Sequence, residues 1–167
     1  IAMLSPGEVV LVPDPCYPIH SFSVLIARGD IRAYDSFEEE EMIASILTGI
    51  KKNPKPKALI ISFPSNPTTQ TVNIEFFNKI VDIAKENKIV VIQYFAYADI
   101  CFDGYKAPSF LQAEGAKEIG VESFSMSKSY NMAEVLVEVN DIGGQVADTL
   151  QFDLEYDNMI MVNQRGR

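Results

Sequence analysis

The sequence contains few of the residues that build metal centres and disulfide frameworks. Its 167 residues include one histidine, two cysteines and no tryptophan. A single histidine excludes zinc and iron sites that need two or more imidazoles, and any Ser-His-Asp triad would have to use His20. The two cysteines, Cys16 and Cys101, cannot form a disulfide framework, and we therefore expect a reducing, cytoplasmic setting and no metal site.

Long apolar runs and positive charge are also scarce. No apolar run approaches the ~20 residues that a membrane-spanning helix needs, and the start of the sequence does not resemble a signal peptide. The 14 Lys and Arg residues are outnumbered by 23 Asp and Glu residues, which gives a net charge of −9. This balance argues against a protein that binds nucleic acid or an anionic membrane through bulk electrostatics.

The composition changes near residue 133. All nine prolines lie before residue 109. Residues 134–167 carry seven acidic and two basic side chains, a net charge of −5, whereas the first 133 residues together carry −4. We interpret this change as the boundary between two segments of different origin.

The hydrophobic pattern predicts an α/β fold. Short β-branched runs alternate with stretches whose apolar residues recur with the 3.6-residue period of a helix. Uniformly apolar strands separated by helices are typical of a parallel sheet covered on both faces, so we expect a three-layer, doubly wound domain with a mostly parallel sheet. The predicted strands are 9–12, 32–34, 58–63, 89–92 and 122–127, and the predicted helices are 17–28, 74–87, 110–117 and one that follows residue 36.

The helix that follows residue 36 has a recognisable starting pattern. Ser36 and Glu39 have the spacing of a capping box, in which each side chain bonds a free backbone N–H of the first turn. The acidic run 38–41 would then lie in the first turn, where the helix dipole favours negative charge. The acidic run is therefore interpreted as capping and solvation rather than as a metal site.

Four chemically useful side chains follow predicted strands. Tyr17 comes after the first strand, Asn66 after the third, Tyr97 after the fourth and Lys128 after the last of the five. In open α/β sheets, ligands bind beyond the carboxyl ends of the strands, so these side chains converge on one edge. An aromatic ring, an amide, a phenol and an amine can stack on, hydrogen-bond and covalently hold a planar heteroaromatic aldehyde.

Several segments resemble one enzyme family. The segments 95–100 (FAYADI), 102–109 (FDGYKAPS) and 125–132 (SMSKSYNM) resemble the fold-type I, pyridoxal-phosphate-dependent aminotransferases of class I and II. The resemblance is strongest to the alanine and LL-diaminopimelate aminotransferase branch, and it runs from residue 1 to about residue 133. It implies a partial cofactor-binding large domain, with pyridoxal phosphate as the cofactor.

The resemblance also implies roles for individual residues. Lys128 matches the lysine that holds the cofactor covalently and then moves a proton. Asn66 and Tyr97 match the side chains that hydrogen-bond the 3′ oxygen of the cofactor. Tyr17 matches the aromatic residue that stacks on the pyridine ring, and Ser125 matches a hydroxyl that binds the phosphate.

Two positions depart from the family pattern. Tyr94 stands where the family has the aspartate that pairs with the protonated pyridine nitrogen, and a phenol with a pKa of about 10 cannot supply that negative charge. Leu136 stands where the family has an arginine on the cofactor phosphate, a contact typically worth about 1.5–3 kcal/mol. Both departures predict weakened retention of the cofactor.

The acidic tail has a resemblance of its own. Segments 135–140, 144–148 and 153–156 resemble a stretch of the nuclease domain of tailed-phage large terminases, in which Glu138 matches a metal-binding carboxylate. The pattern of the tail predicts a strand at 135–139, a helix at 145–154 and a strand at 159–162. We therefore expect residues 1–133 to form the partial aminotransferase domain and residues 134–167 to form a strand-helix-strand tail that packs on the same sheet.

These interpretations lead to one leading hypothesis and two alternatives. The leading hypothesis is an aminotransferase-like domain that is truncated and chimeric. Its family moves an amino group between an amino acid and a 2-oxo acid, and the chain alone would have weak or no activity. Apolar faces left uncovered by absent parts predict a homo-oligomer. The alternatives are a non-catalytic α/β domain that binds no cofactor and a nuclease-derived module that acts through the tail.

Overall fold

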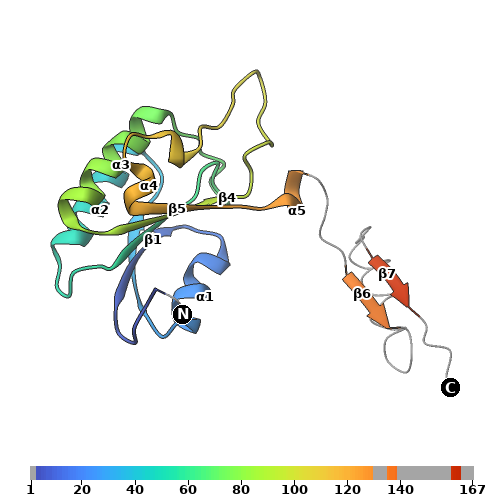
Figure 1. Cartoon of the computed structure of the whole chain (residues 1–167), viewed down its shortest axis with the longest axis horizontal. Helices are drawn as coiled ribbons and strands as arrows, with labels where there is room; N and C mark the ends of the chain where they lie inside the picture. The colour runs from blue at the N-terminus through green and yellow to red at the C-terminus, as the bar shows by residue number, and fades with distance from the viewer. Residues whose placement is uncertain (1–2, 130–134, 139–158, 163–167) are drawn as a thin grey trace. The chain divides into compact units, whose positions relative to one another are not determined.

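The computed structural model describes residues 3–129, 135–138 and 159–162. The chain divides into two compact units, Ile1–Ser125 and Met126–Arg167. The first unit contains the sheet, its covering helices and most of the residues singled out by the sequence (Figure 1). In the part of the chain that is described, no helix is long and apolar enough to cross a membrane.

The first unit is built on a five-stranded sheet in which every neighbouring pair of strands is parallel. Its strand order is β2-β1-β3-β4-β5, which confirms the predicted parallel α/β architecture and places β2 at an edge. The strands are β1 (Val9–Asp14), β2 (Asp30–Asp35), β3 (Ala58–Ile61), β4 (Val90–Phe95) and β5 (Gly120–Phe124).

Helices cover the two faces of this sheet unequally (Figure 1). The connection from β1 to β2 runs in one direction across the sheet and the later connections run in the other, so right-handed crossovers put α1 on one face and the following helices on the opposite face. The helices are α1 (Pro18–Ile26), α2 (Glu39–Lys51), α3 (Ile74–Asn87) and α4 (Ala116–Ile119), with a short 3₁₀ turn, η1 (Phe110–Gln112), before α4. The prediction of one helix over 110–117 is wrong, because Gly115 adopts a left-handed conformation (φ 77°) and separates η1 from α4.

Two hydrophobic clusters hold the layers together. The larger one lies between the sheet and the helices α2 and α3, and its aromatic rings meet edge to face: the centroids of Phe63 and Phe76 are 5.3 Å apart, and those of Phe77 and Phe110 are 5.7 Å apart. The smaller one lies under α1 and consists of Val10, Val12, Val24, Ala58 and Ile60. Each cluster forms the core of one interface between the sheet and the helices on that face, as expected for a three-layer domain.

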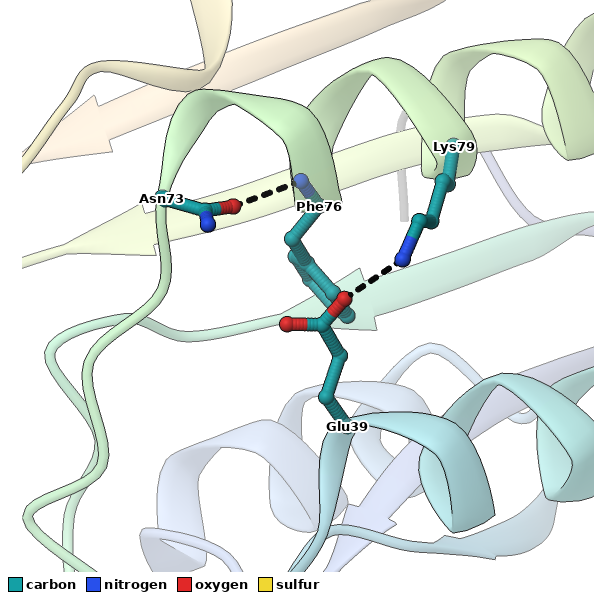
Figure 2. Close-up of polar contacts among 4 residues, drawn as sticks. All are labelled: Glu39, Asn73, Phe76 and Lys79. Atoms are coloured by element: carbon teal, nitrogen blue, oxygen red, sulfur yellow. Dashed lines mark hydrogen bonds and ion pairs between the residues drawn. The ribbon is translucent and has the colours of Figure 1, made fainter.

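The helix α3 has the bounds that its periodicity predicted. Asn73 caps its start, since the side-chain oxygen accepts a hydrogen bond from the Phe76 amide at 3.0 Å (Figure 2). Such a cap satisfies one of the amide groups that a helix start leaves unpaired. At the other end Lys88 takes a left-handed conformation (φ 54°), and its amide bonds carbonyls of the last turn.

The helix α2 does not begin with the predicted capping box. It starts at Glu39, and the preceding Glu38 makes no side-chain cap. Ser36 is instead buried, and its hydroxyl donates to the Pro15 carbonyl at 3.2 Å, which joins the end of β2 to the loop after β1. Glu39 pairs with Lys79 of α3 at 2.8 Å on the exposed surface of the two helices (Figure 2).

Arg32 of the edge strand β2 closes the end of α2. Its guanidinium donates to four backbone carbonyls, those of Gly49 (2.7 Å), Lys52 (3.0 Å), Asn53 (3.4 Å) and Pro54 (3.1 Å). A helix leaves its last carbonyls unpaired, and a positive charge at that end also complements the helix dipole.

The second unit contains α5 (Met126–Ser129), β6 (Val135–Glu138) and β7 (Met159–Val162). The strands β6 and β7 pair with each other in parallel, and both were predicted from their apolar runs. The helix predicted at 145–154 lies outside the described residues. Packing of the tail on the five-stranded sheet stays a prediction.

Candidate functional site

The strand order reverses direction at β1, between β2 on one side and β3 on the other. The chain leaves β1 toward β2 on one side, whereas β3 lies on the other side of β1 and leads on toward β4. The loops that follow β1 and β3 therefore part from each other, and a crevice between such loops is the usual ligand site of doubly wound sheets. Tyr17 belongs to the loop after β1, and Asn66 belongs to the loop after β3.

Asn66 and Tyr97 meet at this edge. The Asn66 side-chain amide donates to the Tyr97 hydroxyl oxygen at 2.9 Å, and both side chains are half-buried. The two residues follow β3 and β4, which are neighbouring strands, so the bond joins two adjacent loops. Because the Tyr97 oxygen already accepts a bond, its own proton is left to be donated to a ligand.

A cluster of three aromatic rings lies beside this pair. The rings of Tyr17 and Tyr94 are nearly parallel, with an interplanar angle of 9° and centroids 6.4 Å apart. The His20 ring stands almost perpendicular to both, at 5.3 Å from Tyr94 and 6.1 Å from Tyr17. The stacking of Tyr94 on Tyr17 was not expected from the sequence.

Two members of this cluster, Tyr94 and His20, are uncharged near pH 7. Burial raises the pKa of the Tyr94 phenol above its ordinary value, and the nearby phenols of Tyr17 and Tyr97 raise it further. Burial also lowers the pKa of the His20 imidazole from 6.5 to about 4. The imidazole is 4 % exposed, and neither of its nitrogens has a hydrogen-bond partner among the described residues. The cluster therefore offers rings and hydroxyls rather than charge.

A cavity of about 590 Å³ lies beside the hydrogen-bonded pair. Asn66 and Tyr97 line it together with the apolar side chains Ile100 and Phe102. Tyr105 also lines it, and the position of this ring is fixed by a hydrogen bond from its hydroxyl to the Val72 carbonyl at 2.7 Å. Neither Tyr17 nor Tyr94 is among its lining residues. This cavity was not predicted from the sequence, because irregular loops form its walls.

The remaining predicted site residues lie at the end of the first unit and in the second. Ser125 directly follows β5, whose last residue Phe124 pairs with Phe95 at the end of β4, so it leaves the sheet at the same edge as the loop carrying Tyr97. Lys128 belongs to α5 in the second unit. The phosphate contact of Ser125 and the covalent role of Lys128 stay predictions.

The tail residues discussed above lie on β6. Leu136 pairs in register with Ile160 of β7, and Glu138 is the last residue of β6. Among residues 3–129, 135–138 and 159–162, there is no group of three or more His, Cys, Asp or Glu side chains that could hold a metal ion.

Comparison with known proteins identifies the family. The sequence pattern of "Aminotransferase class I and II" matches residues 1–137. The chain belongs to this family. The match extends four residues beyond the compositional change at 133, and the resemblance drawn from the strand-end motifs is confirmed.

Individual aminotransferases support the same assignment. Glutamate-pyruvate aminotransferase AlaC of Escherichia coli K12 is 46 % identical over 134 residues, which cover 80 % of this chain and 32 % of the relative. LL-diaminopimelate aminotransferase of Gloeobacter violaceus is 37 % identical over 134 residues, which cover 79 % of this chain and 34 % of the relative. The chain thus spans about a third of the length of these curated aminotransferases.

Solved aminotransferase structures share the fold. Substrate-bound BacF of Bacillus subtilis is 34 % identical with a TM-score of 0.68, and the match covers 78 % of this chain and 33 % of BacF. The aromatic aminotransferase of Pyrococcus horikoshii is 27 % identical with a TM-score of 0.71, and the match covers 79 % of this chain and 36 % of that protein. The α/β fold of the first unit is therefore that of the pyridoxal-phosphate-dependent transferases.

Proposed function

We propose that the chain is the core of a pyridoxal-phosphate-binding domain of an aminotransferase. Its substrates would be an amino acid and a 2-oxo acid, between which the family moves an amino group. The chain has only about a third of the length of its relatives, so we expect weak or no transamination from this polypeptide alone.

The observation that carries the proposal is the hydrogen bond between Asn66 and Tyr97. The pair bridges the loops after two adjacent strands, at the edge where doubly wound sheets bind ligands. An amide and a phenol held together in this way present a hydroxyl proton to an acceptor such as the 3′ oxygen of pyridoxal phosphate. The family resemblance assigns both residues to that oxygen, independently of their contact in the structure.

The described residues fit one side of the cofactor ring better than the other. On the 3′ oxygen side, Asn66 and Tyr97 supply the expected donors. On the ring-nitrogen side, Tyr94 is a neutral phenol, and its neighbour His20 is a neutral imidazole. Neither can balance a protonated pyridine, whose charge would be costly to bury without a counter-charge. The lack of a counter-charge at the ring nitrogen supports the prediction of weak cofactor retention.

Each residue of the proposed site has one task. Pyridoxal phosphate, when bound, supplies an aldehyde carbon and an electron-withdrawing ring. Lys128 would hold the aldehyde carbon through its amine and then move a proton. Ser125 would bind the phosphate, and Tyr17 would stack on the ring.

The test is to trap the cofactor on the chain. The purified protein is incubated with pyridoxal phosphate, reduced with borohydride, digested, and mapped by mass spectrometry. We expect the reduced adduct on Lys128, and we expect it to vanish in Lys128→Arg while Lys117→Arg, a matched surface change, retains it. An adduct spread evenly over several lysines would favour the alternative of an α/β domain without a cofactor site.

A further inference from the structure

The alternation of β4 turns Tyr94 toward α1. Val91 is buried in the cluster under α2 and α3, whereas Ile92 packs against the smaller cluster under α1. Side chains of a strand point alternately to its two faces, so Tyr94 lies on the same face as Ile92. The helix α1 begins directly after Tyr17 on that face. A side chain from the middle of the sheet thus meets the residue expected to stack on the cofactor.

The spacing of the two tyrosine rings leaves no room for a third ring between them. Their planes cannot be farther apart than their centroids, which are 6.4 Å apart. A ring between two others needs about 7 Å, since carbon atoms in contact are about 3.5 Å apart. If the two rings are displaced sideways but their planes are still about 3.5 Å or more apart, a ring stacked on Tyr17 toward Tyr94 would lie about 5.4 Å or less from the Tyr94 centroid, which makes their edge atoms overlap.

We propose that the Tyr94 ring blocks the position on Tyr17 at which the pyridine ring of the cofactor would stack, so that the cofactor ring binds there only when the Tyr94 side chain turns away. The inference rests on the proposed function, because that function makes Tyr17 the stacking partner. It adds a steric cause of weak binding to the electrostatic cause that the sequence suggested.

The open side of the sheet gives Tyr94 a place to turn to. Its partner in register on β5 is Ser123, which is small and exposed, and the next residue along the same face, Val121, is 50 % exposed. Tyr94 can therefore move over β5 without displacing a packed side chain. The free protein holds Tyr94 against Tyr17 and His20. Only the fraction of molecules in which Tyr94 has turned away therefore binds the cofactor, and the apparent affinity falls in proportion to that fraction.

The experiment compares pyridoxal phosphate binding to the full chain and to two Tyr94 variants. Tyr94→Ala frees the face of Tyr17 without adding charge, and we expect the dissociation constant to fall about 10-fold, the equilibrium equivalent of losing one or two aromatic contacts. Tyr94→Phe retains the blocking ring, and we expect it to bind within about twofold of the unmodified chain. The dissociation constants come from absorbance titration, and thermal unfolding checks that each variant folds.

A second variant tests the same inference from the opposite direction. Ser123→Phe fills the space over β5 into which Tyr94 would turn, and we expect it to weaken binding about threefold or more. This variant keeps the inference testable if Tyr94→Ala does not fold. Equal or weaker binding by folded Tyr94→Ala, or unchanged binding by Ser123→Phe, would overturn the inference.

The outcome also separates this inference from the proposed function. If Lys128 is labelled equally well in the unmodified chain and in Tyr94→Ala, with the same dissociation constant, the blocking role is wrong and the cofactor-binding function stands. If Lys128 is labelled in neither, the proposed function fails, and the inference fails with it.

Discussion

The two faces of the five-stranded sheet are packed very differently. On the face under α2, α3 and η1, the rings of Phe76, Phe77 and Phe110 are completely buried. On the other face, α1 exposes 56 % of Phe22 and 67 % of Ile26, and Val121 of β5 is half exposed. Exposed apolar side chains that lie close together usually mark an interaction surface. We conclude that one face supplies the stability of this unit, whereas the other is open for contacts.

The candidate site belongs to the weakly packed face. Tyr17, His20 and Tyr94 all lie where α1 meets the carboxyl ends of the strands. Tyr17 and Tyr94 are only half-buried, and side chains with few packing neighbours can change conformation at low cost. This separation allows changes at the site with little loss of folding free energy.

The difference in packing between the two faces of the sheet is tested most strongly by a matched pair of phenylalanines. Phe76→Ala creates a cavity on the packed face, and we expect the free energy of unfolding to fall by about 3–5 kcal/mol. Phe22→Ala removes a ring from the open face, and we expect a change within about 0.5 kcal/mol. Urea denaturation measures both, and similar losses in the two variants would contradict the comparison.

On the packed face, the backbone of Gly120 at the start of β5 lies close to Phe110 and Val91. A Cβ atom at Gly120 would lie 2.5 Å from the Phe110 ring and 2.9 Å from the Val91 carbonyl oxygen. We expect Gly120→Ala to lower the free energy of unfolding by about 1–3 kcal/mol, because the backbone must shift. Ser123→Ala, on the exposed side of the same strand, serves as the control in thermal unfolding. A Gly120→Ala variant as stable as this control would show that Gly120 is not closely packed against Phe110 and Val91.

His20 makes the stability of the open face dependent on pH. Its pKa is lowered to about 4 in the folded chain, so between pH 6.5 and 4 the unfolded chain binds a proton that the folded chain does not. The free energy of unfolding therefore decreases as the pH falls through this window. We expect His20→Phe to remove about 1–2 kcal/mol of this decrease, as measured by urea denaturation at pH 7 and pH 4. Parallel pH profiles of the two proteins would contradict a buried neutral imidazole.

A helix cap on the packed face gives a smaller effect. Asn73→Ala removes the side-chain bond to the Phe76 amide at the start of α3, and we expect a loss of about 1 kcal/mol in chemical denaturation. Asn78→Ala, at an exposed position inside the same helix, is the matched control and should be neutral or slightly stabilising. Equal effects would mean that the cap contributes nothing.

The smallest expected effect on folding comes from the exposed residues of α1. We expect the double variant Phe22→Ser, Ile26→Ser to unfold within about 0.5 kcal/mol of the unmodified chain. We also expect it to reduce the predicted self-association, as measured by sedimentation velocity, because both side chains are largely exposed. Unchanged sedimentation would show that α1 is not the contact surface.

The sequence predicted the regular elements well and their ends less well. The apolar periodicity of residues 74–87 predicted the bounds of α3 correctly. The capping box of Ser36 and Glu39 was wrong, because the Ser36 hydroxyl bonds Pro15, a partner 21 residues away that a local pattern cannot reveal. The helix expected over 110–117 was interrupted by Gly115, whose left-handed conformation depends on its surroundings.

The candidate site was predictable where motifs existed. The family resemblance assigned Asn66 and Tyr97 to the same cofactor oxygen, and the structure brings the two side chains into contact. The stacking of Tyr94 on Tyr17 joins residues 77 positions apart in the chain, and it depends on β4 turning one particular side chain toward α1. The cavity beside Asn66 could not be predicted, since its walls are loops without a repeating pattern.

Arg32 has a consequence for how this chain can vary. It recognises only backbone carbonyls in the segment 49–54, so the side chains of Lys52 and Asn53 play no part in closing the end of α2. Those two side chains can therefore change without loss of these four bonds, whereas Arg32 cannot. A lysine there has three donors on one atom and cannot reproduce the planar fork of the guanidinium. Mutational tolerance is thus concentrated in the loop, and intolerance is concentrated in a single side chain on a neighbouring strand.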